Sequence, residues 1–425
     1  MSIALNNLPT VLVGLALFFI VSGAFFGLLR GFARSFLRFF TVFAAFIGSA
    51  LGCAYFVQNP ERVLSFGKVQ ALLSKIPLLQ TLRTSLPEVY EILISLPVAM
   101  AAPLLFLAVF LALSLVLLIV YGIMAAFIFP KKQCGWRFRP VSGTLGAVIG
   151  AIQGVLIMLA VMVPVVGLVT VTVDAVDYAE SEQGVYESAA IETLKEYRGT
   201  LIEVQSSRVF GYARLLRADK ISESLMRLRL KDETGKLTDV SVKNEIVCLA
   251  GVYAHAMPLL GKDVKDYGES QAEALALLAE DFRKSELLTR VAAELLSEAC
   301  TEWKADKPFL GKAPIAAEGE LGELMTVFYD TFDDASRDTV ATDFQTVSSV
   351  FSVLARYGVF SLIGDGEALQ EKFAEGELLE ELAAILNANP RTRALETALL
   401  RLPSRRSAPS FWTGSARRQG RATMP

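Results

Sequence analysis

Long stretches without a charged residue dominate the first two fifths of the chain. They cover residues 10–29, 39–57, 98–129 and 141–173. A helix of 20 residues is about 30 Å long, which is the thickness of a bilayer core. Pro103 and Pro164 are expected to break or kink the two longest stretches. The pattern therefore predicts a membrane module, 1–173, in which four spanning helices cover about 10–29, 39–57, 104–129 and 142–163.

Basic residues follow the first span and precede the fourth. They are Arg30, Arg34 and Arg38 in the first link, and Lys131, Lys132, Arg137 and Arg139 in the second. Short loops rich in lysine and arginine stay in the cytoplasm, so both chain termini are expected on the opposite, extracytoplasmic side. The nine residues before the first span contain no basic residue, unlike a cleaved signal peptide. The three arginines are expected to share one helical face beside anionic lipid headgroups.

Small residues recur every four positions within the spans. The rows are Gly23, Gly27 and Gly31; Gly146, Gly150 and Gly154; and Gly48 with Gly52. Such rows let helix backbones approach closely in lipid, either within one chain or between the chains of a homo-oligomer. The predicted spans contain no Asp, Glu, Lys, Arg or His, which argues against a proton-coupled pump. Gln153 is expected to form an interhelical hydrogen bond.

The segment between the second and third spans, residues 58–97, has apolar residues at helical spacing and four prolines that divide it. This pattern predicts two small amphipathic helices. They could lie on the outer membrane surface or pack as a cap on the bundle, and the pattern leaves both open.

Charge separates the rest of the chain from the module. Residues 1–173 hold 11 Lys/Arg and 3 Asp/Glu, a net charge of +8, whereas residues 174–425 hold 30 and 41, a net charge of −11. Apolar residues three and four positions apart predict a helical extracytoplasmic domain over 174–402. Glu286–Leu295 and Glu377–Leu386 share six of ten residues, which indicates a duplicated helical unit or a chance likeness. Residues 403–425 are typical of a disordered basic tail.

The expected fold class is all-α, with a four-helix polytopic membrane bundle followed by a helical extracytoplasmic domain. Candidate helices outside the spans cover about 185–207, 209–229, 240–259, 270–284, 286–301, 318–333, 339–362, 369–387 and 391–402.

Few residues are suited to catalysis. His255 is the only histidine, it falls within a helical pattern, and the chain has no G-x-S-x-G, P-loop or C-x-x-C motif. We therefore assign no catalytic, metal-binding or cofactor-binding residue, and we expect neither enzymatic activity nor nucleic-acid binding. Asp330, Asp334 and Asp338 could bind a divalent cation or form a solvated acidic face.

Two cysteines fall in the expected extracytoplasmic domain. Cys248 and Cys300 could form a disulfide in an oxidising compartment. The alternative, which the composition favours, is that they remain buried thiols.

Two segments of the module resemble the colicin V production protein family of bacterial membrane proteins. Gly27–Phe40 reads GLLRGFARSFLRFF, and Ser142–Ile157 reads SGTLGAVIGAIQGVLI. The resemblance covers about residues 8–173 and includes the order of four spans and two basic links. The chain departs from the family at Pro140–Gly143, where a charged pair is usual, and at Gln153, where arginine is common.

The resemblance implies a protein of the bacterial plasma membrane that is linked to toxin production or export and to envelope stress. It carries over no catalytic residue. We expect a scaffold or accessory factor whose membrane module contacts the lipid bilayer and whose helical domain binds a protein partner. The alternatives are a component of an oligomeric channel or transporter, and an unrecognised extracytoplasmic enzyme. The serine protease fused to some relatives is excluded by the lack of a suitable histidine.

Overall fold

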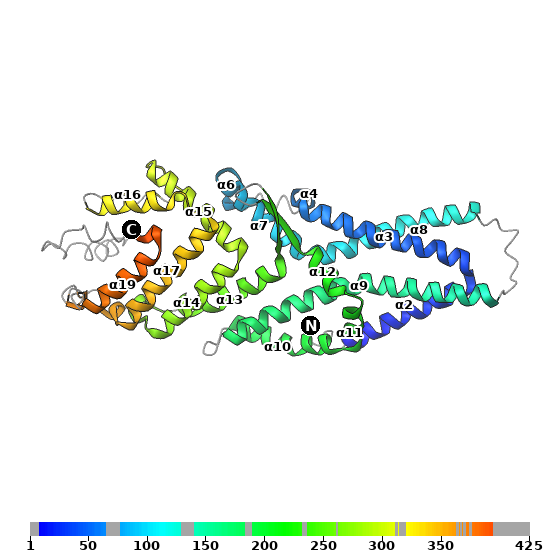
Figure 1. Cartoon of the computed structure of the whole chain (residues 1–425). Coiled ribbons are helices and arrows are strands. Elements are labelled where there is room, and N and C mark those ends of the chain that lie inside the picture. Colours follow the sequence, from blue (N-terminus) through cyan, green and yellow to red (C-terminus); the bar gives the residue numbers. More distant parts are fainter. Residues whose placement is uncertain are drawn as a thin grey trace, which may run out of the picture. The chain divides into compact units, whose positions relative to one another are not determined.

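The computed structural model describes residues 8–64, 77–128, 140–182, 189–231, 236–260, 262–310, 313, 320–362, 365, 368, 371–373 and 376–393. Helices make up nearly all of this part, which confirms the all-α class (Figure 1). The chain forms two compact units. The first unit comprises Met1–Ile76, Glu91–Tyr178 and Glu187–Val247, and the second comprises Pro77–Tyr90, Ala179–Tyr186 and Cys248–Pro425. The units therefore differ from the boundary at residue 173 that the charge pattern suggested.

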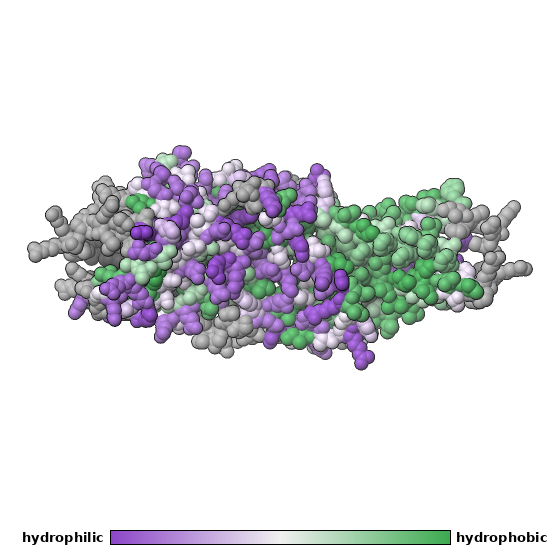
Figure 2. Space-filling model, viewed as in Figure 1, coloured by the Kyte–Doolittle hydropathy of each residue, from purple (hydrophilic) through white to green (hydrophobic). Residues whose placement is uncertain are grey.

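Four helices of the first unit are long and apolar enough to cross a membrane, among the residues that the structure describes. They are α2 (Leu8–Arg30), α3 (Phe32–Gln58), α8 (Ala102–Ile128) and α9 (Pro140–Glu182). Large apolar side chains such as those of Phe18, Leu115 and Val148 point outward. Figure 2 shows the resulting hydrophobic surface over these helices. Apolar surface of this extent fits contact with lipid chains.

The fourth span differs from the prediction. Pro164 was expected to interrupt it, but α9 continues through Pro164 as one helix of 43 residues. At 1.5 Å per residue this is about 65 Å, roughly twice a bilayer core. The second half of α9 is packed within protein, because Val163, Val166 and Val169 are all buried. Packing on this scale offsets the roughly 3 kcal/mol that an interior proline costs a helix. Pro103, in contrast, lies in the first turn of α8, where proline is well tolerated.

Helices α3 and α8 form a long aromatic and small-residue contact. Phe46 meets Phe106 edge-to-face with ring centroids 5.3 Å apart, and Phe106 stacks with Phe110 along α8. The thiol of Cys53 lies 3.1 Å from the carbonyl oxygen of Ala102. These contacts hold the second and third spans together.

The first unit also contains α10 (Ala189–Ser206), α11 (Arg208–Leu215), α12 (Ala218–Leu225) and an antiparallel hairpin of β1 (Arg227–Lys231) and β2 (Leu237–Ser241). The prediction of one helix over 209–229 is therefore wrong. Arg217 adopts a left-handed conformation that separates α11 from α12. The sequence RLRLK then alternates, with Leu228 and Leu230 buried between exposed basic residues, and alternation of this kind suits a strand.

The second unit is built from helices that nearly all match the predicted ranges. They are α6 (Pro77–Ser85), the start of α7 (Pro87–Met100), most of α13 (Val242–Leu260), α14 (Glu269–Lys284), α15 (Glu286–Lys304), α16 (Glu320–Phe332), α17 (Arg337–Arg356) and α19 (Gly376–Ala388). Ser285 and Ser336 cap α15 and α17, since each hydroxyl accepts a hydrogen bond from the third backbone amide of its helix. The short elements are α4 (Pro60–Leu64) in the first unit, and η2 (Val264–Asp266) and η3 (Val359–Leu362) in the second.

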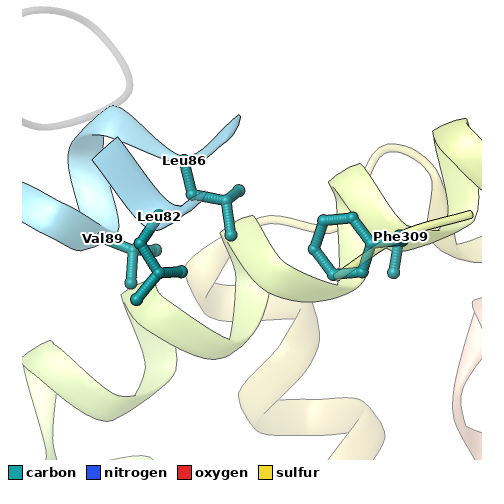
Figure 3. Packing of buried hydrophobic residues seen from close by; sticks show 5 residues of the cluster. Leu82, Leu86, Val89 and Phe309 are labelled. Atoms are coloured by element: carbon teal, nitrogen blue, oxygen red, sulfur yellow. The ribbon is translucent and has the colours of Figure 1, made fainter. Parts of the chain in front are cut away.

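Part of the segment between the second and third spans is built into this second unit. Leu82, Leu86 and Val89 are buried against Ala299 and Phe309 (Figure 3). Tyr90, Leu295 and Trp303 border the same cluster. The apolar face of α6 is therefore covered by protein from the α15 region. The sequence had left open a place on the membrane surface or a cap on the bundle, and neither includes this contact.

Candidate functional site

The first candidate is the contact between α2 and α9. A Cβ atom added at Gly27 would lie under 3.0 Å from the carbonyl oxygen of Gly146, and one added at Gly150 would approach the carbonyl oxygen of Gly23 as closely. Gly154 faces the backbone of Phe19 in the same way. The structure thus brings two of the predicted glycine rows together within one chain, where no side chain larger than hydrogen fits.

The turn between α2 and α3 lies at one end of this glycine contact. Gly31 has a φ of 75°, a conformation that favours glycine, and it also faces Gly146. The backbone amide of Phe32 donates a hydrogen bond to the hydroxyl of Ser142 over 3.2 Å. The two segments that carry the family resemblance therefore meet each other at this turn.

The basic residues at this turn do not share one helical face, contrary to expectation. Arg30 ends α2, whereas Arg34 and Arg38 belong to the first turns of α3 beyond Gly31. The guanidinium of Arg30 lies 5.2 Å from the ring centre of Phe26, which is cation–π distance. Lys131, Lys132, Arg137 and Arg139 lie outside the described residues.

The remaining glycines and the polar residues of the spans lie inside the bundle. Gly48 faces Leu113, and Gly52 faces Val109, so this row supports the α3–α8 contact. The side chain of Gln153 is buried beside the α2–α9 contact. The interhelical hydrogen bond expected for Gln153 stays a prediction.

The second candidate is a buried polar network at the end of the second unit. The Nδ2 amide of Asn389 donates to Asp343 Oδ1 over 2.7 Å and to Thr346 over 3.2 Å. Arg391 Nε lies 3.1 Å from Asp343 Oδ2, and its Nη1 lies 2.7 Å from Asp334. The guanidinium also lies over the ring of Phe332 at 5.3 Å. This network joins α17 to the chain that follows α19.

Two opposing effects set the protonation of Asp343. Burial raises the pKa of this carboxyl, while the hydrogen bond from Asn389 and the charge of Arg391 lower it. Burial dominates, so the folded-state pKa lies above the ordinary value.

Of the acidic residues considered for a cation, Asp330 and Asp334 are each paired with a base. Lys304 Nζ lies 2.6 Å from Asp330 and 3.1 Å from Asp333, and hydrogen bonds to these two groups raise the pKa of Lys304. Asp330 and Asp338 belong to different helices, so they do not share a face. Within the described residues, no group of three His, Cys, Asp or Glu side chains is arranged to hold a metal ion.

Cys248 and Cys300 form no disulfide in this structure. Cys300 is buried beside Tyr329 and Phe332 on α16. Burial is the main cause that raises the pKa of this thiol to about 11. A thiol in this state is rarely ionised at neutral pH and is therefore a poor nucleophile.

His255 is buried on α13, and its Nδ1 lies 3.1 Å from Asp281 Oδ2. The helical pattern predicted the position of His255 but not this partner, because Asp281 lies on another helix, α14. Asp281 is also 3.6 Å from Lys284. We interpret this group as a polar contact that joins α13 to α14, since both side chains are almost fully buried.

Comparisons with protein-family models, with curated proteins and with solved structures give no match for this chain.

The glycine contact predicts opposite effects for two substitutions in α2. Gly27→Ala should destabilise the bundle by about 1–3 kcal/mol, because the new methyl group overpacks the contact with Gly146. Gly14→Ala is the matched control, since nothing lies within 4 Å of the position of its Cβ, and alanine favours a helix by about 1 kcal/mol. The measurement is detergent-induced unfolding of the full-length protein followed by circular dichroism. Equal behaviour of the two variants would contradict the close approach.

The polar network predicts a pH-dependent loss of stability for Asn389→Ala. The change removes a donor to the charged carboxylate, so the folded-state pKa of Asp343 rises further above its unfolded value. The stability of the variant then falls as the pH rises from the unfolded-state pKa of Asp343 to its folded-state pKa. The loss should be about 1.5–3 kcal/mol at pH 7 and small below pH ~4.

Urea unfolding of the full-length protein measures this loss through the fluorescence of Trp303, once Trp136 and Trp412 are replaced by phenylalanine. Asn387→Ala is the control, because Asn387 is exposed two residues earlier and should change stability by less than about 0.5 kcal/mol. A loss that is the same at both pH values would show that Asn389 acts without Asp343.

Proposed function

We propose that this chain is a non-enzymatic scaffold or accessory factor of the bacterial plasma membrane, with a role in toxin production or export or in envelope homeostasis. Its four apolar helices anchor it in the bilayer. Its second unit lies outside the cytoplasm and binds a protein partner.

The observation that carries this proposal is the inclusion of residues 77–90 in the second unit. Leu82, Leu86 and Val89 precede α8, whereas Ala299 and Phe309 follow α9, and the five side chains share one core. Both segments must therefore lie on the same side of a membrane, and two crossings by α8 and α9 meet this condition. A unit tied to the spans at several points in the chain is well suited to hold a partner near the bilayer.

Charge supports a partner for the second unit. Residues 248–402 hold 14 Lys/Arg and 27 Asp/Glu, a net charge of −13. A field of this sign favours association with a basic surface. Some of these acidic residues, such as Asp330, Asp333 and Asp334, are paired with bases inside the unit, and the excess of acidic over basic residues supplies this field.

The link to toxin production rests on the two segments that resemble colicin V production proteins. The meeting of these segments at Gly31 and Ser142 supports treating them as one structural feature rather than as two separate similarities. The extracytoplasmic location rests on the basic residues of the two short links, which favour a cytoplasmic position for those links.

Reporter fusions test the location of the second unit. Alkaline phosphatase fused after Asn59 and after Pro425 should be active, because both positions lie beyond an even number of spans. Green fluorescent protein fused after Gly31 should be fluorescent. Fluorescence after Pro425 combined with phosphatase activity after Asn59 would contradict the shared core. Fluorescence at both positions would place the second unit in the cytoplasm and overturn the proposed location.

A flux measurement separates the scaffold from the channel. Liposomes containing the full-length protein should show no ion or solute flux above that of protein-free liposomes, because the uncharged stretches of the four spans contain no Asp, Glu, Lys, Arg or His to line a path. The outcome that overturns the scaffold is a flux that Gly150→Leu abolishes and Gly14→Leu retains. These two variants are matched because only Gly150 lies in the close backbone contact.

A further inference from the structure

Helix α11 presents an unusual outward surface for a helix beyond the four spans. Tyr212, Leu215 and Leu216 are 66%, 78% and 44% exposed. Arg208, Arg214 and Arg217 lie exposed among them. Large apolar residues with this exposure cost free energy in water, so the surface is expected to have an occupant.

The helix has a buried face as well. Phe210 and Ala213 on this face are buried within the first unit. Positions 208, 212 and 215 lie on the opposite side at 100° per residue. The capping hydroxyl of Ser207 accepts a hydrogen bond from the amide of Phe210 and fixes the start of the helix. The outward face is therefore presented by a packed element.

The charge of this surface has one sign. Residues 204–218 contain three arginines and no acidic residue. Among the described residues, none of these three guanidinium groups forms an ion pair with a carboxylate. Arg214 lies over the ring of Phe210 at 5.1 Å and is exposed. A surface of this kind is complementary to anionic oxygens.

Helix α11 packs beside α2, and both belong to the first unit. Figure 1 shows α11 near the end at which the chain enters α2. The outward residues of α2, including Val11, Leu17 and Phe18, form part of the surface that faces lipid chains. The α11 surface therefore lies beside the end of a span, which is where lipid headgroups meet the hydrocarbon core.

We propose that α11 lies in the interfacial layer of the bilayer and binds anionic phospholipid. Tyr212, Leu215 and Leu216 enter the boundary between headgroups and acyl chains, where tyrosine and leucine are favoured. Arg208, Arg214 and Arg217 contact the phosphate groups. The proposal rests on the insertion of the four apolar helices, and it adds a membrane contact after the last span.

Lipid suits this surface better than a protein partner or a second copy of the chain. Helix α11 contacts α2 within one unit, and large apolar side chains of α2 are exposed. It also combines exposed apolar side chains with basic charge alone, which is the composition of helices that lie on anionic membranes.

An environment-sensitive label tests the proposal in the full-length protein. Cys134 and Cys248 are replaced by serine, while Cys53 and Cys300 are buried and stay. A nitrobenzoxadiazole dye is attached at Leu215→Cys, and the protein is placed in nanodiscs of phosphatidylglycerol and phosphatidylcholine. We expect blue-shifted emission, protection from aqueous iodide, and stronger quenching by nitroxides near the headgroup than by those near the chain end.

Two matched positions separate failure of this proposal from failure of membrane insertion. Phe18→Cys on α2 should be quenched by nitroxides near the chain end, and Leu379→Cys on α19 should remain open to iodide. A quenched Phe18 label with an iodide-accessible Leu215 label overturns the interfacial helix alone. An unquenched Phe18 label overturns insertion of the bundle. A Leu215 label that is protected from iodide but not quenched by lipid nitroxides shows a protein cover and overturns the lipid assignment.

The arginines are tested by charge removal. The variant R208Q/R214Q/R217Q should lower the ratio of lipid-bound to water-exposed label by about fivefold per lost charge. When the three arginines are retained, nanodiscs of phosphatidylcholine alone should lower this ratio to a similar extent. Protection that is insensitive both to the variant and to the lipid charge overturns the role of the anionic headgroups.

Discussion

The backbones of α2 and α9 approach so closely that only glycine fits between them at several positions. This constraint sets the arrangement of the first unit. It fixes the side of α9 that faces α2 and places the Gly31 turn against Ser142. In lipid, where apolar side chains gain little by leaving one another, close backbone contact is a main source of attraction between helices. The outward side chains are then free to be large and apolar.

The length of α9 links this bundle to the rest of the first unit. Its first half has large apolar side chains exposed on one side, and its second half is buried against protein. Gly167 in this second half allows Ser222 of α12 to pack directly on the helix, since a Cβ at that position would overlap the serine side chain. One continuous helix thus serves as a span and then as a core element. This dual role explains why helices after residue 173 belong to the same unit as the spans.

The sequence predicted the spans and most helices, because their patterns are long and strongly periodic. Its errors have local causes. Pro164 does not end α9, since tertiary packing stabilises the helix beyond it. The RLRLK segment is a strand and not the end of a helix, and its alternation with a period of two is the local sign of this. The glycine rows were recognised, but which rows meet depends on the fold. Partners such as Asp281 for His255, Asn389 for Asp343 and Phe309 for Leu86 join distant parts of the chain, and a single sequence carries no signal for such pairs.

The core shared by α6 and α15 also bears on how the protein is made. Leu82, Leu86 and Val89 leave the ribosome well before their partners Ala299 and Phe309. At about 5–20 residues per second, the apolar face of α6 waits on the order of 10 s or more while two further spans are inserted. During that interval the apolar face of α6 is exposed and prone to aggregation. During biogenesis, a chaperone or the membrane surface would protect this face of α6 from aggregation.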